Sequence, residues 1–301
     1  MEENASRPVI ECDNVTHRFG ARTIYSGLSF KVEEGQTLGL LGKNGTGKTT
    51  IINILNGYLR PTSGHCRIWG EDSSNLSPAT KARIGLQLEG HVQHTYFDVR
   101  EIEKFYSKFF EKWNSDAYYS LISRLRISPR QKISTMSCGQ RSQVALGLIM
   151  AQNPDLLILD DFSMGLDPGY RRLFVEKLKD FSLMGTEGHP KTMFVTSHII
   201  QDMEKVVSHC MIFDYGRVIC QVKTSELLEK IRRYTFVSGM DEAPSSSKLI
   251  NVERIRGNQW EAYSMEDEGL AREEIDKIGG REVTVERLNL HDAFIGLTGK
   301  Y

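Results

Sequence analysis

Long apolar runs are missing from this chain of 301 residues. The longest, such as residues 144–151 and 156–159, are far shorter than the roughly 18 residues that suggest a membrane span. Residues 1–8 are polar and acidic and contain no apolar core, so we expect no signal peptide. Any connection of this chain to a membrane is therefore expected to be made through a partner.

A strong charge of one sign is also lacking, and so is any grouping of cysteines. The net charge is -1 and no Lys/Arg block is visible, which argues against direct binding of nucleic acid. The five cysteines lack the spacing of a disulfide framework or a metal site, which fits a reducing compartment. With 40% hydrophobic and 26% charged residues, the composition indicates a globular protein with one large and one small domain, or with two ordinary domains.

The pattern of apolar segments predicts an α/β fold. Residues 9–39 alternate apolar stretches with turn signals, which predicts short antiparallel strands. Bounded apolar runs predict buried strands of a parallel sheet at residues 37–41, 156–159, 193–196 and 211–214. Helices are predicted at residues 48–59, over much of 98–127 and from about residue 140. Strands that alternate with helices in this way imply a parallel sheet covered by helices.

A smaller unit is predicted beyond a polar linker. Its pattern is ββαβα, with elements at residues 249–255, 260–264, 267–278, 282–288 and 291–298. We therefore divide the chain into a domain of residues 1–235, with a helical subdomain at about 90–140, a linker of residues 236–248, and a small α/β domain of residues 249–301. In the last helix, Leu290, Phe294 and Leu297 are expected to pack on this small domain.

One segment has the layout of a phosphate-binding P-loop. Glycines let backbone N–H groups surround an anion without obstruction, and the helix that follows directs its positive end at the phosphates. Lys48 is expected to reach the β- and γ-phosphates, and the Thr49 hydroxyl to ligate Mg²⁺. The residues predicted to bind nucleotide here are Gly42, Lys43, Asn44, Gly45, Thr46, Gly47, Lys48, Thr49 and Thr50.

Two carboxylates end one of the predicted buried strands. Asp160 suits coordination of Mg²⁺ at the end of the strand 156–159, and Asp161 suits polarising an attacking water. The pair follows the segment Met136-Ser137-Cys138-Gly139-Gln140 by about the length of one helix and a turn. This spacing favours a functional role for the two carboxylates over the alternative that they simply belong to a solvent-exposed loop.

These motifs and their order resemble those of the ABC ATPase family over roughly residues 9–225. Residues 136–140 resemble the family's LSGGQ signature, residues 165–168 its D-loop, and His198 its switch histidine. Phe19 stands where the family has an aromatic ring that stacks on adenine. The tail, residues 288–299, is similar to the end of ATPases that serve bacterial export permeases.

The resemblance implies a P-loop NTPase (RecA-like) core with an N-terminal antiparallel β-subdomain, a helical subdomain and a small C-terminal α/β module. It implies an ATPase that uses ATP and Mg²⁺ and forms a head-to-tail dimer of identical or different ATPase subunits. The implied partner is a separate transmembrane permease working in export, with the ATPase in the cytoplasm, peripheral on the inner face of the cell membrane. Besides the P-loop, the residues implied to contact ATP are Phe19, Ser137, Gly139, Gln140, Asp167 and His198.

The sequence departs from the family's pattern at three positions. Asp161 replaces a glutamate and is one methylene shorter, so the predicted base has a reduced reach. Cys138 replaces a glycine, where it either fits as a small residue or is strained by a positive φ. Glu89 stands where the family has a glutamine that acts on Mg²⁺ or the attacking water, with Gln87 as the alternative counterpart and Mg²⁺ ligand. These departures leave a second interpretation open: an ATP-binding switch with very low turnover, or the weaker half of a heterodimeric ATPase.

Overall fold

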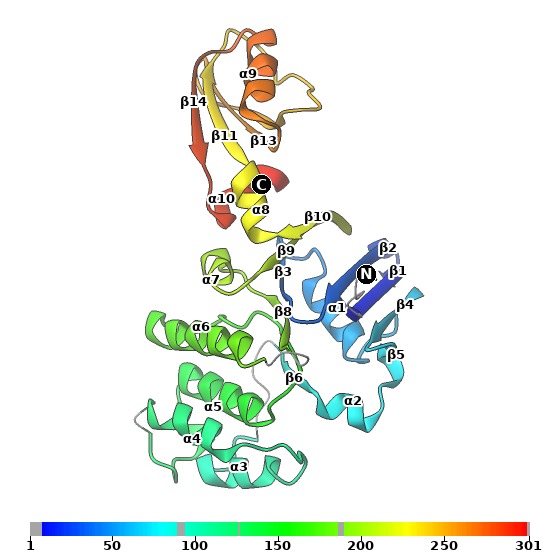
Figure 1. The fold of residues 1–301 in the computed structure, drawn as a ribbon, viewed down its shortest axis with the longest axis vertical. Helices are drawn as coiled ribbons and strands as arrows, with labels where there is room; N and C mark the ends of the chain where they lie inside the picture. Colours follow the sequence, from blue (N-terminus) through cyan, green and yellow to red (C-terminus); the bar gives the residue numbers. More distant parts are fainter. Residues whose placement is uncertain (1–7, 89–93, 126, 186–189, 300–301) are drawn as a thin grey trace, which may run out of the picture.

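The structure is a computed structural model that describes residues 8–88, 94–125, 127–185 and 190–299. Within these residues the strands form a central sheet and two antiparallel sheets. One antiparallel sheet lies beside the central sheet, and the other is in the lobe at the top of Figure 1. None of the helices in the described ranges is long and apolar enough to span a bilayer.

The central sheet has the strand order β10-β9-β3-β8-β7-β6. Its parallel strands are β3 (Thr37–Gly42), β6 (Ile84–Gln87), β7 (Leu156–Leu159), β8 (Thr192–Thr196) and β9 (His209–Asp214), and β10 (Arg217–Lys223) runs antiparallel at the edge. Because the strands are buried on both faces, they are nearly continuous apolar runs, as expected for a parallel sheet. This sheet confirms the predicted α/β fold, and the carboxyl ends of β3, β6, β7 and β8 meet at one edge.

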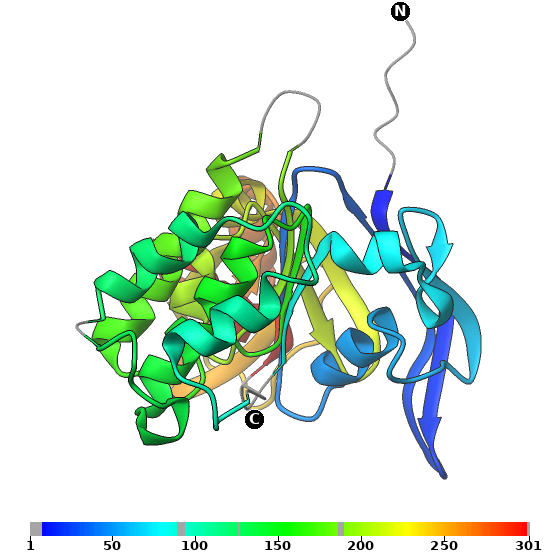
Figure 2. The same cartoon turned by 90° about the horizontal axis from the view of Figure 1, so that it is seen from below.

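The N-terminal sheet covers one side of the central sheet. It consists of β1 (Pro8–Phe19), β2 (Arg22–Glu33), β4 (Ser63–Ile68) and β5 (Glu71–Asp72). Helix α1 (Lys48–Leu55) lies between the two sheets, since its buried isoleucines and Leu55 share one apolar cluster with residues of β1, β2 and β3. Figure 2 shows this sheet on one side and the helical layer on the other.

The helical layer contains α3 (Val99–Tyr106), α4 (Ser115–Ser123), α5 (Cys138–Ala151) and α6 (Pro168–Leu183). Residues 98–127 were expected to be largely helical, but they form two short helices with a non-helical connection. The second helix begins where Asn114 caps it, because the Asn114 carboxamide oxygen accepts from the Ala117 N–H at 3.0 Å. A capping box of Asp98 and Glu101 starts the first helix in the same way.

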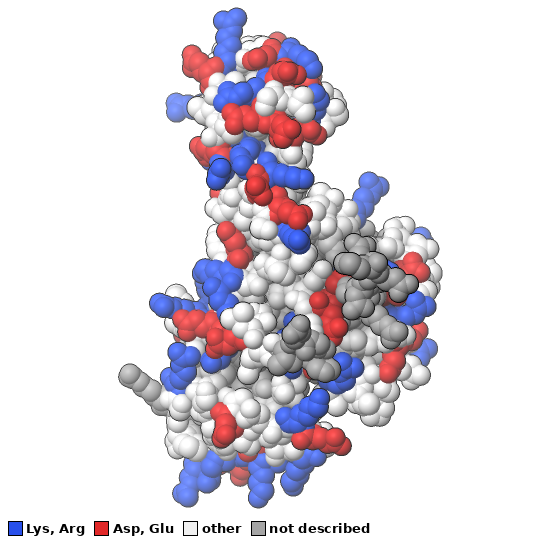
Figure 3. Space-filling view, viewed as in Figure 1, with Lys and Arg blue, Asp and Glu red and all other residues white. Residues whose placement is uncertain are grey.

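The C-terminal elements form a separate lobe at the top of Figure 1. They are β11 (Arg232–Val237), β12 (Ile250–Arg256), β13 (Gln259–Ser264), α9 (Glu268–Lys277), β14 (Arg281–Arg287) and α10 (Leu290–Thr298), joined to the core by α8 (Thr224–Lys230). The predicted ββαβα elements are present, but β11 also belongs to this sheet, between β13 and β14. The expected boundary at residues 235 and 236 therefore falls inside a strand. On the face in Figure 3, charges of both signs are interspersed over the lobe.

The last helix packs on the small domain, as expected, and also on the core around the central sheet. Leu290, Phe294 and Leu297 belong to the apolar cluster that contains Leu159 and Val195 of the central sheet. Helix α10 contacts α7 (Ile200–Glu204) and α8 as well as β12 and β13. The helix is thus part of the core around the central sheet as well as of the C-terminal lobe, which sequence periodicity alone did not indicate.

Candidate functional site

The loop between β3 and α1 has the shape of an anion cradle. Gly47 precedes α1 with φ of 107°, and a Cβ there would lie 2.6 Å from the Tyr25 hydroxyl oxygen, so only glycine fits. The Tyr25 hydroxyl donates to the Gly47 carbonyl, and the Thr46 hydroxyl donates to the Lys43 carbonyl at 2.8 Å. The loop is therefore fixed by bonds that leave the N-terminal end of α1 facing the cavity described below.

Lys48 lies at the centre of this loop. Its Nζ donates to the Gly42 carbonyl at 2.7 Å and to the Lys43 carbonyl at 3.0 Å. Burial lowers the pKa of the Lys48 amine, and the nearby Asp161 and Asp160 carboxylates oppose that shift. The amine is thus a donor held at the surface of a cavity that already contains negative charge.

A cavity of about 640 Å³ opens over the loop. It joins the P-loop to the ends of β7 and β8, and Phe19, with 51% of its surface exposed, lies at its wall. Its lining residues are Phe19, Arg22, Ile24, Asn44, Gly45, Gly47, Lys48, Thr49, Thr50, Asp160, Asp161, Met164, Thr196 and His198. Of these, Arg22, Ile24, Met164 and Thr196 were not predicted, although Thr196 lies only two residues before His198.

Asp160 is a buried carboxylate, and only one of its two oxygens has a hydrogen-bond partner among the described residues. The Thr196 hydroxyl donates to Asp160 Oδ1 at 2.8 Å, whereas Oδ2 has no hydrogen-bond partner among the described residues. The neighbouring strand supplies Gln87, whose carboxamide is also buried and has no partner in the described part of the chain. Their backbones are joined by a 2.8 Å bond from the Asp160 N–H to the Gln87 carbonyl. Asp160 and Thr49 both line the cavity, and the unpaired buried oxygens of Asp160 and of the adjacent Gln87, together with the Thr49 hydroxyl, fit a divalent cation that prefers oxygen ligands.

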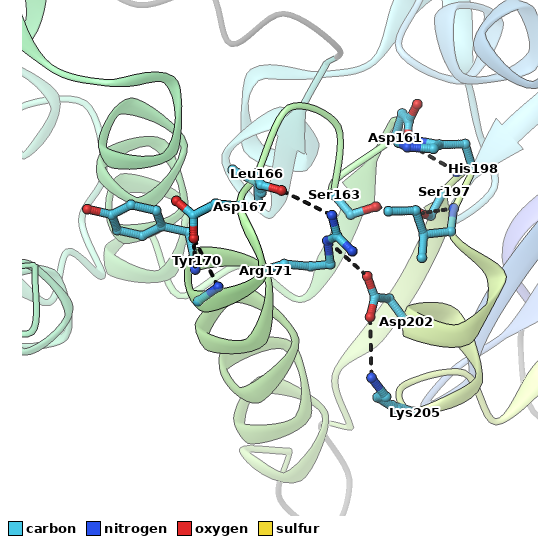
Figure 4. Close-up of polar contacts among 12 residues, drawn as sticks. Asp161, Ser163, Leu166, Asp167, Tyr170, Arg171, Ser197, His198, Asp202 and Lys205 are labelled. Carbon is cyan, nitrogen blue, oxygen red and sulfur yellow. Dashed lines mark hydrogen bonds and ion pairs between the residues drawn. The ribbon is translucent and has the colours of Figure 1, made fainter.

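Asp161 and His198 form a pair beside Asp160 (Figure 4). His198 Nδ1 lies 2.7 Å from Asp161 Oδ1, and the His198 backbone N–H donates to the same oxygen at 3.2 Å. Asp161 has a positive φ of 44°, and its N–H donates to the Thr196 hydroxyl at 2.8 Å. When Nδ1–H donates to the carboxylate in the neutral ring, His198 Nε2 carries a lone pair.

The turn after Asp161 is tied to the segment that follows β8 and bears His198. The Ser163 and Ser197 hydroxyl oxygens are 2.6 Å apart, and the Arg171 guanidinium donates to the Leu166 carbonyl at 3.1 Å (Figure 4). Asp167 caps α6 by accepting from the Gly169 and Tyr170 N–H groups. The turn after Asp161 is thus held in place by hydrogen bonds between residues of the same chain.

Comparison with known proteins identifies the family. Residues 25–163 match the model of the ABC transporter family. A Nod factor export ATP-binding protein I from Cupriavidus metallidurans is 28% identical over 302 positions, covering 97% of this chain and 98% of that protein. A protein of the same name from Paraburkholderia xenovorans is 30% identical over 224 positions, covering 73% and 72% of the two chains.

The chain belongs to the ABC transporter family. It is the ATP-binding subunit, and because ABC ATP-binding domains are ATPases it is an ATPase. Solved structures agree on the fold. The ATP-binding subunit of an ABC transporter gives a TM-score of 0.63 at 19% identity, covering 73% of this chain and 92% of that one. A dimeric ATP-binding cassette bound to ADP and phosphate gives a TM-score of 0.60 at 19% identity, covering 71% and 98%.

The ABC signature segment lies away from the cavity of its own chain. Ser137 caps α5 in a capping box with Gln140, with a 3.2 Å bond from the Gln140 N–H to the Ser137 hydroxyl. Cys138 is exposed and is not among the residues with positive φ, so of the two alternatives the structure supports a small residue that fits without strain. Gly139 is required by packing instead, since a Cβ there would lie 2.4 Å from the Tyr170 ring.

Two residues, Glu89 and Gln87, are candidates for the position where the family has a glutamine. Glu89 lies outside the described residues. Gln87 ends β6 and lies beside Asp160, as described above. Among the described residues it is therefore Gln87 that the fold brings to the carboxylates.

Proposed function

We propose that this ABC ATPase binds and hydrolyses ATP between two subunits arranged head to tail, and that it drives a separate export permease. The observation that carries the proposal is the single cavity in which the P-loop, Asp160, Asp161 and His198 meet. It combines a phosphate cradle, carboxylates suited to a cation and a histidine suited to a reacting water.

Nucleotide binding follows from the shape of this cavity. The phosphates bind the N–H groups of residues 42–50, and Lys48 exchanges its carbonyl acceptors for phosphate oxygens. Phe19 lies on the same cavity and is half exposed, so its ring is available for stacking on adenine. Thr49, Asp160 and Gln87 would hold Mg²⁺, which when bound neutralises charge on the β- and γ-phosphates.

Hydrolysis requires a water oriented toward the γ-phosphate. In the proposed mechanism, Asp161 accepts a hydrogen bond from the Nδ1–H of His198 and fixes the orientation of its ring. Neutral His198 Nε2 accepts a hydrogen bond from the attacking water, and the protonated ring donates from Nε2 to a γ-phosphate oxygen while the Asp161 carboxylate stabilises its positive charge. The short side chain of Asp161 is sufficient for this role, because the His198 ring, and not the carboxylate, extends to the water or the γ-phosphate.

The second subunit completes the site in this proposal. Ser137, Gly139, Gln140 and Asp167 do not line the cavity of their own chain. Ser137 stands at the positive end of α5 and is exposed, so a γ-phosphate from a partner subunit fits there. The arrangement works with two copies of this chain or with a different ATPase subunit.

A transmembrane permease is proposed as the partner, with this chain in the cytoplasm and peripheral on the inner face of the membrane. Helix α3 and its flanks carry large exposed aromatic rings, Tyr96, Phe105 and Phe109, in one cluster. An exposed aromatic patch of this kind suits a protein partner. Export is supported by the names of the curated relatives, which are export ATP-binding proteins.

The alternative is an ATP-binding switch with very low turnover, or the weaker half of a heterodimer. It is favoured by Asp161, because one methylene less displaces the carboxylate from the place of the family's glutamate. A misplacement of ~1 Å is worth about 100-fold in rate. Measured turnover separates the two functions.

The test is steady-state Mg-ATP hydrolysis by the purified chain, alone and with a permease that co-purifies from detergent-solubilised membranes. We expect turnover that Lys48→Ala and Asp161→Asn abolish, whereas the exposed Asp116→Asn serves as a matched control and changes nothing. No turnover by the natural chain under either condition, together with a gain in Asp161→Glu, would support the switch instead.

A further inference from the structure

Helix α10 connects the C-terminal lobe to the nucleotide site. It follows β14 of the lobe, yet its apolar face is buried with Ile200 and Met203 of α7. The Leu290 N–H at its start donates to Glu204 Oε2 at 2.9 Å, which fixes the helix against the segment after His198. Figure 1 shows α10 at the base of the lobe, beside α8.

The other end of α10 contacts the P-loop directly. Lys43 Nζ donates to the Thr298 carbonyl at 2.9 Å. This carbonyl is in the last turn of a helix, where backbone oxygens lack intrahelical donors and the helix dipole is negative, so a cation is favoured there. The contact joins residues that are 255 positions apart in the chain.

Lys43 therefore makes hydrogen bonds both within the P-loop and outside it. Its carbonyl accepts from the Thr46 hydroxyl and from Lys48 Nζ inside the loop, and its amine reaches α10 outside it. A second cavity, of about 360 Å³, lies on this outer side between α10, the P-loop and Ser197-His198. Lys43 lines this cavity and does not line the nucleotide cavity.

We propose that α10 is a strap that holds the P-loop in its phosphate-binding shape through Lys43, so that the C-terminal lobe sets the affinity for ATP. Lys43 is then a positioning residue. The inference rests on the proposed nucleotide site. Without the strap, the loop has to be ordered when ATP binds, and the apparent affinity falls by the fraction of molecules whose loop is competent. Once ATP is bound, the geometry of the complex is the same, and kcat is unchanged.

The experiment is a double-mutant cycle in the full chain. The variants are Lys43→Met, Lys43→Arg, deletion of residues 298–301, and the deletion combined with Lys43→Met. The deletion removes the acceptor carbonyl but leaves Leu290, Phe294 and Leu297 in place. Lys179→Met, on the exposed face of α6, is the matched control. The readouts are KM for ATP, kcat, and Tm without nucleotide.

We expect Lys43→Met and the deletion each to raise KM about three- to ten-fold, the range for losing a partly exposed charged hydrogen bond, with kcat unchanged. The double variant should be no worse than either single change, and Lys43→Arg should restore most of the affinity. If the effects of the two changes on KM add, or if Lys43→Met raises KM and the deletion does not, then Lys43 acts on ATP by its charge. Either result would overturn the proposal.

A purely structural role is also distinguishable. A lower Tm with KM unchanged in both variants overturns the strap while leaving the proposed nucleotide site intact. If the natural chain itself shows no saturable ATP binding, and Lys48→Ala behaves identically, then the proposed function fails and the strap with it.

Discussion

Replacing Thr196 by valine tests how the two carboxylates at the end of β7 are held. The Thr196 hydroxyl donates to Asp160 Oδ1 and accepts from the Asp161 N–H, both at 2.8 Å. Valine keeps the shape but leaves a carboxylate with 2% exposure without its donor, and Asp161 without an acceptor. Losing a hydrogen bond to a buried charged group costs about 2–3 kcal/mol, and the unpaired N–H adds about 1 kcal/mol. The expected loss in the free energy of unfolding is therefore about 3–4 kcal/mol.

Thr192→Val on the same strand is the matched control. Thr192 is equally buried, and its hydroxyl accepts one neutral bond, from the Gly35 N–H at 3.0 Å, so its loss should be only about 1 kcal/mol. The assay is urea unfolding of the nucleotide-free chain, followed by circular dichroism. Equal losses for the two variants would refute the reasoning, because the charge on Asp160 would then have no effect on the cost.

Two further predictions concern the signature segment and the thiols. Gly139→Ala should destabilise the chain by about 1–3 kcal/mol, because its Cβ meets the Tyr170 ring, and Tyr170→Leu in the same chain should recover part of the loss in a thermal-unfolding assay. In native protein treated with an alkylating reagent, Cys138 should be modified first, since it is exposed, whereas Cys12 and Cys66 are buried and burial raises the pKa of the Cys12 thiol. Raising the pH to 9 should not expose Cys12 to the reagent; mass spectrometry that finds early modification there would contradict the buried position.

Local sequence signals were sufficient to predict the parts of the structure that are formed by one continuous segment. The P-loop follows from glycines between a predicted strand and a predicted helix, and the structure has β3 and α1 there. The C-terminal helices and strands after residue 249 were also predicted to within a few residues. In each case the pattern of turn residues and apolar spacing is complete within the segment itself.

Contacts between distant segments could not be predicted in this way. Strand β11 shows the alternation of a strand, with Tyr234 and Phe236 buried, but only its pairing with β13 and β14 assigns it to the C-terminal sheet. The position of Gln87 beside Asp160 likewise depends on the pairing of β6 with β7. Helix α10 was predicted from its spacing, whereas its burial against α7 depends on side chains 90 residues earlier in the chain.

The substitution at position 161 illustrates how tertiary contacts change the meaning of a motif. A non-glycine residue in the left-handed region costs roughly 1–2 kcal/mol, although aspartate tolerates it better than most. Asp161 adopts this conformation because Thr196 accepts from its N–H and His198 binds its carboxylate. One oxygen of the short side chain, Oδ1, lies 2.7 Å from the histidine ring, while Asp161 also lines the cavity. Judged by sequence, the missing methylene is a loss of reach. From these contacts we propose instead that the Asp161–His198 pair acts as one unit on the reacting water.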